Sequence, residues 1–304
     1  MITVLINVVA PVLLMATMGT IIARIRQVPS HSISQVTLYI FSPALVCHSL
    51  IHTALPTEEL GQIALYSGLL ALALYTVVLM IGKVFSLSHS TRSAFYLTTL
   101  FMNAGNYGIP MSLFAFGQEG MERAIVFFVV QATLAGTLAT YLASRSHLNT
   151  RQAFRAVFKI PMLYAGIAGL VMNLLGYQPP AVFGQPLKIL GGAAVPCMLI
   201  VLGIQLSGAF SLREYKGLLA VCLIRLVLSA VVAFLLTWAL NITGLTQQVL
   251  IIVSAMPSAV YTIILATEFR SRPEFVTNAV VATTILSAVT LTPLITLTKL
   301  LADP

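Results

Sequence analysis

The sequence predicts an all-α integral membrane protein whose ten transmembrane helices form two inverted five-helix repeats, with helices 4 and 9 broken. Three observations lead to this prediction: the composition, ten long apolar runs, and proline-containing breaks in both halves. Hydrophobic residues make up 59% of the 304 residues and charged residues only 8%, against about 25% charged in soluble domains. A soluble domain of this composition would lack the polar residues that cover a water-exposed surface.

Each apolar run is near the roughly 20 residues that a helix needs to cross the hydrocarbon core of a bilayer. Nine runs carry no Asp, Glu, Lys or Arg, and the tenth, 217–241, contains Arg225. The nine are 2–23, 32–51, 61–82, 93–117, 124–143, 160–177, 189–208, 246–267 and 275–298. No positively charged segment precedes the first run, so we expect a retained helix there and not a cleaved signal peptide. The longest connection, about 144–159, is too short for a soluble domain.

The distribution of basic residues predicts the orientation in the membrane. Of the 16 Lys and Arg residues, twelve lie in connections on one side and three on the other. The twelve are Arg24, Arg26, Lys83, Arg92, Arg145, Arg151, Arg155, Lys159, Arg213, Lys216, Arg270 and Arg272, and the three are Arg123, Lys188 and Lys299. Because cytoplasmic connections carry the excess of positive charge, both termini are predicted to face outward from the cytoplasmic membrane. The net charge of +8 follows from this bias and implies no nucleic-acid partner.

An internal repeat is indicated by prolines that pair across the two halves. Pro11 pairs with Pro161, Pro43 with Pro196, and Pro110 with Pro257, at separations of 150, 153 and 147 residues. Five helices per half is an odd number, so the second copy must enter the membrane from the opposite side. Inverted repeats with interrupted helices at matching positions are typical of secondary transporters that bind substrate near the midplane.

The proposed breaks are "NAGNYGIP" at 103–110 in helix 4 and "SAMPSAVYT" at 254–262 in helix 9. Gly, Asn and Pro are poor residues for a helix interior. Non-helical backbone is tolerated at membrane depth only where protein or a water-filled cavity satisfies it. We therefore expect the two breaks to meet and to point free N–H groups and helix N-termini at an anionic ligand.

At these residues the chain resembles the auxin efflux carrier family, which includes malonate and malate permeases and the plant auxin exporters. In the first half the resemblance rests on Asn103 five residues before "GIP" and on "FAFG" at 114–117. In the second half it rests on "AMPSA" at 255–259, "LATEF" at 265–269 and "ATTILSAVTLTPL" at 282–294. The long central cytoplasmic loop of many plant exporters is absent, which leaves the identity of the substrate open.

The resemblance implies a fold shared with bile-acid symporters and sodium/proton antiporters, in which the broken helices 4 and 9 cross each other, and an elevator-type alternating-access motion. Scaffold helices 1–2 and 6–7 would occupy 1–52 and 155–208, and the transport unit, helices 3–5 and 8–10, would occupy 61–143 and 213–300. A homodimer through scaffold helices is expected on the same basis. No Asp or Glu lies inside a predicted helix core, so the chain lacks the intramembrane carboxylate that a cation antiporter needs.

The predicted ligand is therefore a small organic anion, a carboxylate such as malonate, malate or an auxin-like acid. We expect its carboxylate to lie between Asn103 and the segment Pro257–Ser258, because an isolated carboxylate in a low-dielectric interior is very costly. Arg225, within helix 8, is a further candidate for contact. The full predicted site comprises Asn103, Gly105, Asn106, Tyr107, Gly108, Pro110, Arg225, Pro257, Ser258 and Tyr261.

The favoured function is a secondary active transporter in the cytoplasmic membrane, with a carboxylate substrate and membrane lipid as its partners. Two alternatives stay open: a sodium-coupled symporter of the bile-acid type, and a non-transporting membrane receptor for the same ligand. Coupling to a proton or to sodium is left undecided. His48 and His52 share a helix face but have no third ligand nearby in the sequence, so no metal site is expected. No catalytic or cofactor-binding motif is present, and neither an enzyme nor a cofactor is expected.

Overall fold

The structure is a computed structural model that describes residues 1–26, 28, 30–136, 161–208 and 210–302. Within these ranges the chain is helical, and its only β-type pairing is one isolated antiparallel bridge between Met102 and Ser258. Among the described residues, six helical segments are long and apolar enough to cross a membrane, and α10 (Pro161–Leu174) and α14 (Gly244–Ser254) are shorter apolar helices. The six are Ile2–Arg26, His31–Ile51, Thr57–Val84, Ala181–Leu206, Tyr215–Ala239 and Pro273–Leu300. The predicted all-α, multi-pass membrane protein is confirmed at this level.

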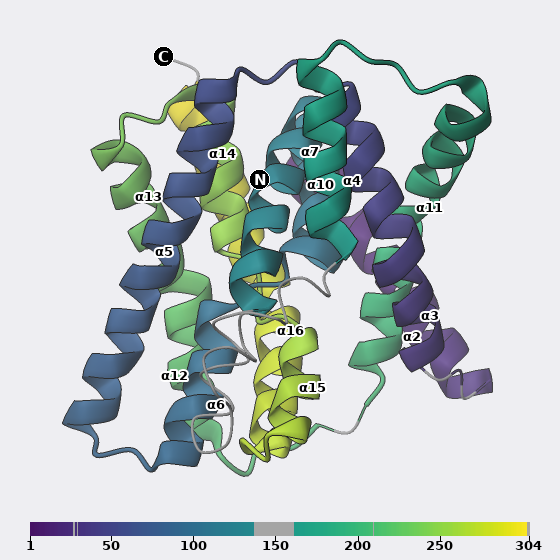
Figure 1. Cartoon of the computed structure of the whole chain (residues 1–304). Coiled ribbons are helices and arrows are strands. Elements are labelled where there is room, and N and C mark those ends of the chain that lie inside the picture. The colour runs from purple at the N-terminus through teal and green to yellow at the C-terminus, as the bar shows by residue number, and fades with distance from the viewer. Residues whose placement is uncertain (27, 29, 137–160, 209, 303–304) are drawn as a thin grey trace.

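One group of helices contains the N-terminal segments and the two helices that follow residue 160 (Figure 1). Its elements are α1 (Ile2–Val4), η1 (Leu5–Val9), α2 (Ala10–Arg26), α3 (Ser30–Val36), η2 (Thr37–Phe41), α4 (Ser42–Ile51), α10 (Pro161–Leu174) and α11 (Ala181–Leu206). Helix α11 packs against both α2 and α4, and α10 packs against α4.

The second group contains the helices that approach one another around the bridge. Its elements are α5 (Thr57–Val84), α6 (His89–Leu100), η3 (Ala104–Gly108), α7 (Ile109–Leu134), α12 (Tyr215–Cys222), η5 (Leu223–Leu228), α13 (Ser229–Ala239), α14 (Gly244–Ser254), α15 (Tyr261–Glu268) and α16 (Pro273–Ala302). In Figure 1, the labels of α7 and α14 lie in the upper half and those of α6 and α15 in the lower half, so each broken helix has one part on either side of its break.

The ends of these helices follow from local sequence. Ser88 caps α6, where its Oγ accepts a hydrogen bond of 3.3 Å from the Thr91 backbone N–H. Glu58 and Glu59 lie in the first turn of α5, where negative charge favours the helix dipole. Pro43 lies directly after the π-helical turn η2 in a continuous helical segment, and because it has no N–H it cannot make the helical hydrogen bond of its position.

Helices α2 and α11 approach each other so closely that their backbones are in contact. A Cβ atom built on Gly203 of α11 would lie 1.7 Å from the Ala16 carbonyl oxygen, and one on Gly19 would lie 2.2 Å from the Ile200 carbonyl oxygen. The Thr20 hydroxyl donates a hydrogen bond of 2.8 Å to the Gly203 carbonyl. Small residues let the two backbones touch, as they do at many membrane helix interfaces.

The structure corrects the predicted break in helix 4. Pro110 does not lie in an unwound segment but at the start of α7, where its ring fits the first turn. The chain leaves helical geometry earlier, at 101–103, and then forms the π-helical turn η3, in which the Gly108 N–H bonds the Asn103 carbonyl at 2.9 Å. The pairing of Pro110 with Pro257 was therefore misleading, because the two prolines hold different structural positions.

The apolar runs 93–117 and 124–143 predict a connection at 118–123 between helices 4 and 5, but in the structure residues 118–134 are helical and the connection is a kink within α7. Its direction changes at Gly117, whose φ of 72° is a conformation that other residues rarely adopt. The predicted end of helix 5 and the connection 144–159 lie outside the described residues, as do parts of the predicted units 61–143 and 155–208.

Candidate functional site

Two helix breaks meet at the centre of the second group and bond to each other through their backbones. The Asn103 N–H donates to the Pro257 carbonyl at 2.8 Å, and the Ala259 N–H donates to the Phe101 carbonyl at 2.8 Å. These two bonds flank the Met102–Ser258 bridge. Each break thus satisfies backbone groups of the other, which is the condition for non-helical backbone at membrane depth. The predicted contact between the two breaks is present, although it begins at 101 and not at 103.

Arg225 braces this crossing from the neighbouring segment η5. Its side chain is fully buried, and its guanidinium donates to the Met256 carbonyl at 3.0 Å and to the Thr99 carbonyl at 2.5 Å. It also donates to the Ser254 carbonyl and to the Ser229 hydroxyl. Thr99 lies in the last turn of α6 and Ser254 ends α14, so one side chain holds the C-terminal ends of both half-helices.

A cavity of about 780 Å³ lies beside the crossing and between the two groups of helices. Its wall includes Phe101–Asn106 from the first break and Ala259–Tyr261 from the second. Helix α11 contributes Val201 and Gln205, and α7 contributes Gln131 among others. Most of the remaining wall is apolar, from residues such as Leu38, Phe128, Met162, Ile263, Ile264 and Leu265. A large, mainly apolar cavity with a few polar groups is the usual form of a small-molecule site.

Three polar side chains on this wall have an atom without a hydrogen-bond partner. They are Asn103 through Nδ2, Gln131 through Nε2 and Gln205 through Oε1. Asn103 and Gln131 are 5% and 3% exposed, and both atoms are covered in this conformation. A buried polar group without a partner costs about 1–3 kcal/mol, so a ligand that draws these amides into the cavity recovers that cost.

The predicted site residues divide into two sets. Asn103, Gly105, Asn106 and Tyr261 line the cavity. The other six are not among its lining residues, and several of them hold the crossing together. These six are Tyr107, Gly108, Pro110, Arg225, Pro257 and Ser258.

The contacts of the second set show how its members support the crossing. The Ser258 hydroxyl donates to the Thr98 carbonyl at 2.6 Å, and the Ser258 N–H donates to the Thr283 hydroxyl at 3.1 Å. The Tyr107 hydroxyl lies 3.2 Å from the Ser287 hydroxyl of α16. These bonds tie both breaks to α6 and α16.

Sequence reasoning missed part of the cavity wall. Gln131 and Gln205 were not selected, although an amide in an otherwise apolar span was a usable signal. Glu268 was not selected either, but it also lines the cavity. Another amide in an apolar span, Asn278, does not line the cavity, and its Oδ1 accepts a hydrogen bond of 2.9 Å from the Ser211 N–H.

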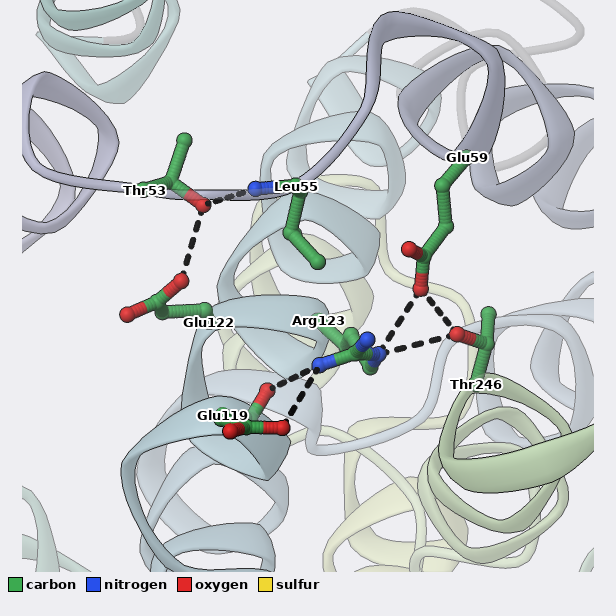
Figure 2. A network of polar contacts seen from close by, with 7 residues as sticks. All are labelled: Thr53, Leu55, Glu59, Glu119, Glu122, Arg123 and Thr246. Atoms are coloured by element: carbon green, nitrogen blue, oxygen red, sulfur yellow. Dashed lines mark hydrogen bonds and ion pairs between the residues drawn. The ribbon is translucent and has the colours of Figure 1, made fainter.

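A separate polar network lies around residues 119–123 of α7, just after the kink at Gly117 (Figure 2). Arg123 Nε donates to Glu59 of α5 and to the Thr246 hydroxyl of α14, each at 2.8 Å. The adjacent Glu122 accepts a hydrogen bond of 2.8 Å from the hydroxyl of Thr53, which follows α4. Two consecutive residues of α7 therefore have partners in different parts of the protein. Arg123 bonds to other helices of the second group, and Glu122 bonds to Thr53, next to the first group.

Comparison with known proteins agrees with a transport role. A family model described as membrane transport protein matches residues 143–295. A transporter of Methanocaldococcus jannaschii, itself named as uncharacterised, is 26% identical over 292 residues, which cover 92% of this chain and 94% of that protein. Another of that description, from Methanothermobacter thermautotrophicus, is 35% identical over 190 residues, or 61% of each chain. The chain belongs to the family of membrane transport proteins that contains the auxin efflux carriers.

Proposed function

We propose that this membrane transporter is a secondary active carrier that moves a small organic carboxylate across the cytoplasmic membrane. The observation that supports the substrate class most directly is the set of unpartnered amides on the cavity wall, at Asn103 and Gln131. An amide N–H donates to a carboxylate oxygen, and a hydrogen bond to a charged group contributes about 1.5–3 kcal/mol.

The helix N-termini beside the cavity add donors. The segment that begins with η3 and the helix α15 both start at the cavity wall, and neither has a side chain that caps it. The first backbone N–H groups of a helix have no partner within that helix. Those of Thr262 and Ile263 donate to the carbonyls of Ala259 and Val260, just before α15. The remaining N–H groups and the amides form a set of donors on a wall that also contains His31 and Glu268. Such a set suits a carboxylate and offers little to a metal ion.

We further propose that the chain has ten membrane spans in two inverted repeats, with both termini outside. In this arrangement the first group of helices is the scaffold and the second is the moving transport unit. The location of the cavity between the two groups supports this division, because a displacement of one group past the other would carry the crossing with it. An elevator-type motion of the second group is the mechanism that we infer.

Thermal-shift measurements on the purified protein should identify the ligand, since a compound that binds the folded state raises its melting temperature. The panel contains benzoate, butyrate, malonate and malate, each beside its primary amide as an uncharged control. We expect at least one carboxylate to stabilise the protein and its amide to do so less. Uptake of that carboxylate into proteoliposomes, with and without sodium and a proton gradient, then measures the coupling. Equal effects of acids and amides would contradict the proposed substrate class.

The hydrogen bond between Thr53 and Glu122 makes the alternating-access proposal testable. It joins the two groups beyond Ile51, at the opposite end of the span His31–Ile51 from the cavity-lining His31, so transport should require its separation. In the double variant Thr53→Cys/Glu122→Cys, a short thiol-specific crosslinker should abolish uptake, and a cleavable version should restore uptake after reduction. The native cysteines at 47, 197 and 222 are replaced by alanine in this background.

The matched control is the double variant Glu59→Cys/Thr246→Cys. These two side chains are also hydrogen-bonded, but both belong to the second group, so their crosslink should leave uptake intact. Uptake that survives the crosslink between 53 and 122, or that fails equally in the control, would argue against relative motion of the two groups.

A further inference from the structure

Four helix ends meet at the crossing, and their dipoles differ in sign. The C-terminal ends belong to α6 and α14, and the N-terminal ends belong to the η3–α7 segment and to α15. A helix C-terminus acts as roughly half a negative charge and an N-terminus as roughly half a positive charge. Without a charged side chain nearby, the partial charges of the four helix ends would sum to about zero. The crossing would then have little preference for an anion over a neutral ligand.

Arg225 acts on only one pair of these ends. Its guanidinium bonds the carbonyls of Thr99 and Ser254, at the C-terminal ends, and of Met256 just beyond α14. Arginine is always charged, and among the described residues no carboxylate lies within ion-pair distance of Arg225. The N-terminal ends, by contrast, carry no side-chain cap and border the cavity.

We infer that Arg225 determines the charge selectivity of the cavity without touching the ligand. By neutralising the two C-terminal ends, it leaves the two N-terminal ends, together about one positive charge, facing the cavity. This inference rests on the proposed function, since it explains why the same site prefers a carboxylate. It also accounts for the location of a fully buried arginine that is not among the cavity-lining residues.

The size of the effect follows from Coulomb's law. A unit charge roughly 10 Å from a carboxylate, at the effective dielectric constant of about 20 that suits protein interiors, changes the binding constant about tenfold. An uncharged ligand of the same shape feels almost none of this field. Loss of the charge should therefore lower the affinity for the carboxylate about tenfold and leave the affinity for its amide nearly unchanged.

The experiment compares Arg225→Gln, which keeps hydrogen-bond donors but removes the charge, with Arg225→Lys, which keeps the charge with fewer donors. Ser229→Ala is the control, because it removes one partner of the guanidinium and leaves the charge in place. Affinities for benzoate and benzamide, and for malonate and malonamide, are measured by calorimetry on the full-length protein in nanodiscs. The ratio of acid to amide affinity is the readout, and the melting temperature reports stability separately.

We expect the ratio to fall about tenfold in Arg225→Gln and to stay near the wild-type value in Arg225→Lys and Ser229→Ala. A folded Arg225→Gln variant with the wild-type ratio would overturn the inference. If that variant does not fold, the Arg225→Lys variant tests the inference instead. A lower ratio of acid to amide affinity in Arg225→Lys, despite the retained charge, overturns the inference. An unchanged ratio together with a lower melting temperature supports it. Wild-type protein that binds acid and amide equally well would refute the proposed function itself, which keeps the two failures distinct.

Discussion

The Gly203→Ala variant is expected to lose about 3 kcal/mol of stability or more, enough to lower the melting temperature by about 10 °C or to prevent folding. The added Cβ would lie 1.7 Å from the Ala16 carbonyl oxygen and 2.9 Å from the Thr20 backbone nitrogen. Both atoms belong to the backbone of α2, so no side-chain rotation relieves the overlap. Helices α2 and α11 would have to separate, which would also stretch the hydrogen bond from Thr20 to Gly203.

Gly192→Ala on the same helix is the matched control. A Cβ at Gly192 meets nothing within 4 Å, and alanine favours a helix over glycine by about 1 kcal/mol. The Gly-to-Ala substitution should therefore lower the melting temperature at position 203. At position 192 it should leave the melting temperature unchanged or raise it. Fluorescence-detected size-exclusion chromatography after heating, in detergent and in lipid, measures both. Equal melting temperatures for the two variants would mean that the contact between α2 and α11 does not support the fold.

The fold was predictable from the sequence where hydropathy alone decides it. The apolar runs identified the helices of the described regions, because a membrane span must be long, apolar and helical to satisfy its backbone. The exact residues at which a helix is broken were less predictable. Pro110 was taken as the break, but a proline starts a helix as readily as it interrupts one, and the sequence does not distinguish the two positions.

The residues of the candidate site that belong to the helix breaks were predictable from the sequence. Asn103, Asn106 and Tyr261 lie in or beside the two breaks and reach the cavity wall. Gln205 could not be placed in the same way, because its position depends on how α11 packs against η3. Arg225 was recognised as unusual, but its bonds to the backbone of two other helices depend on the crossing itself, which no local pattern encodes.

The Asn103→Ala variant is expected to bind the carboxylate ten- to a hundredfold more weakly, with little change in melting temperature. The loss corresponds to one hydrogen bond to a charged group, about 1.5–3 kcal/mol. Stability should hold because Asn103 Nδ2 has no hydrogen-bond partner within the protein. The local backbone is held by other groups: the Asn103 N–H bonds the Pro257 carbonyl, and the Asn103 carbonyl accepts from the Gly108 N–H.

Asn103→Asp should be worse than Asn103→Ala, since it replaces a donor with a like charge next to the anion. Asn173→Ala is the control with the opposite expectation. The Asn173 amide donates to the carbonyls of Ile51 at 2.8 Å and Thr53 at 3.0 Å, away from the cavity wall, so its loss should lower the melting temperature and leave affinity unchanged. Calorimetry on folded protein measures the affinities. Wild-type affinity in both Asn103 variants would place the carboxylate at another donor, with Gln131 next in order because its Nε2 also has no partner.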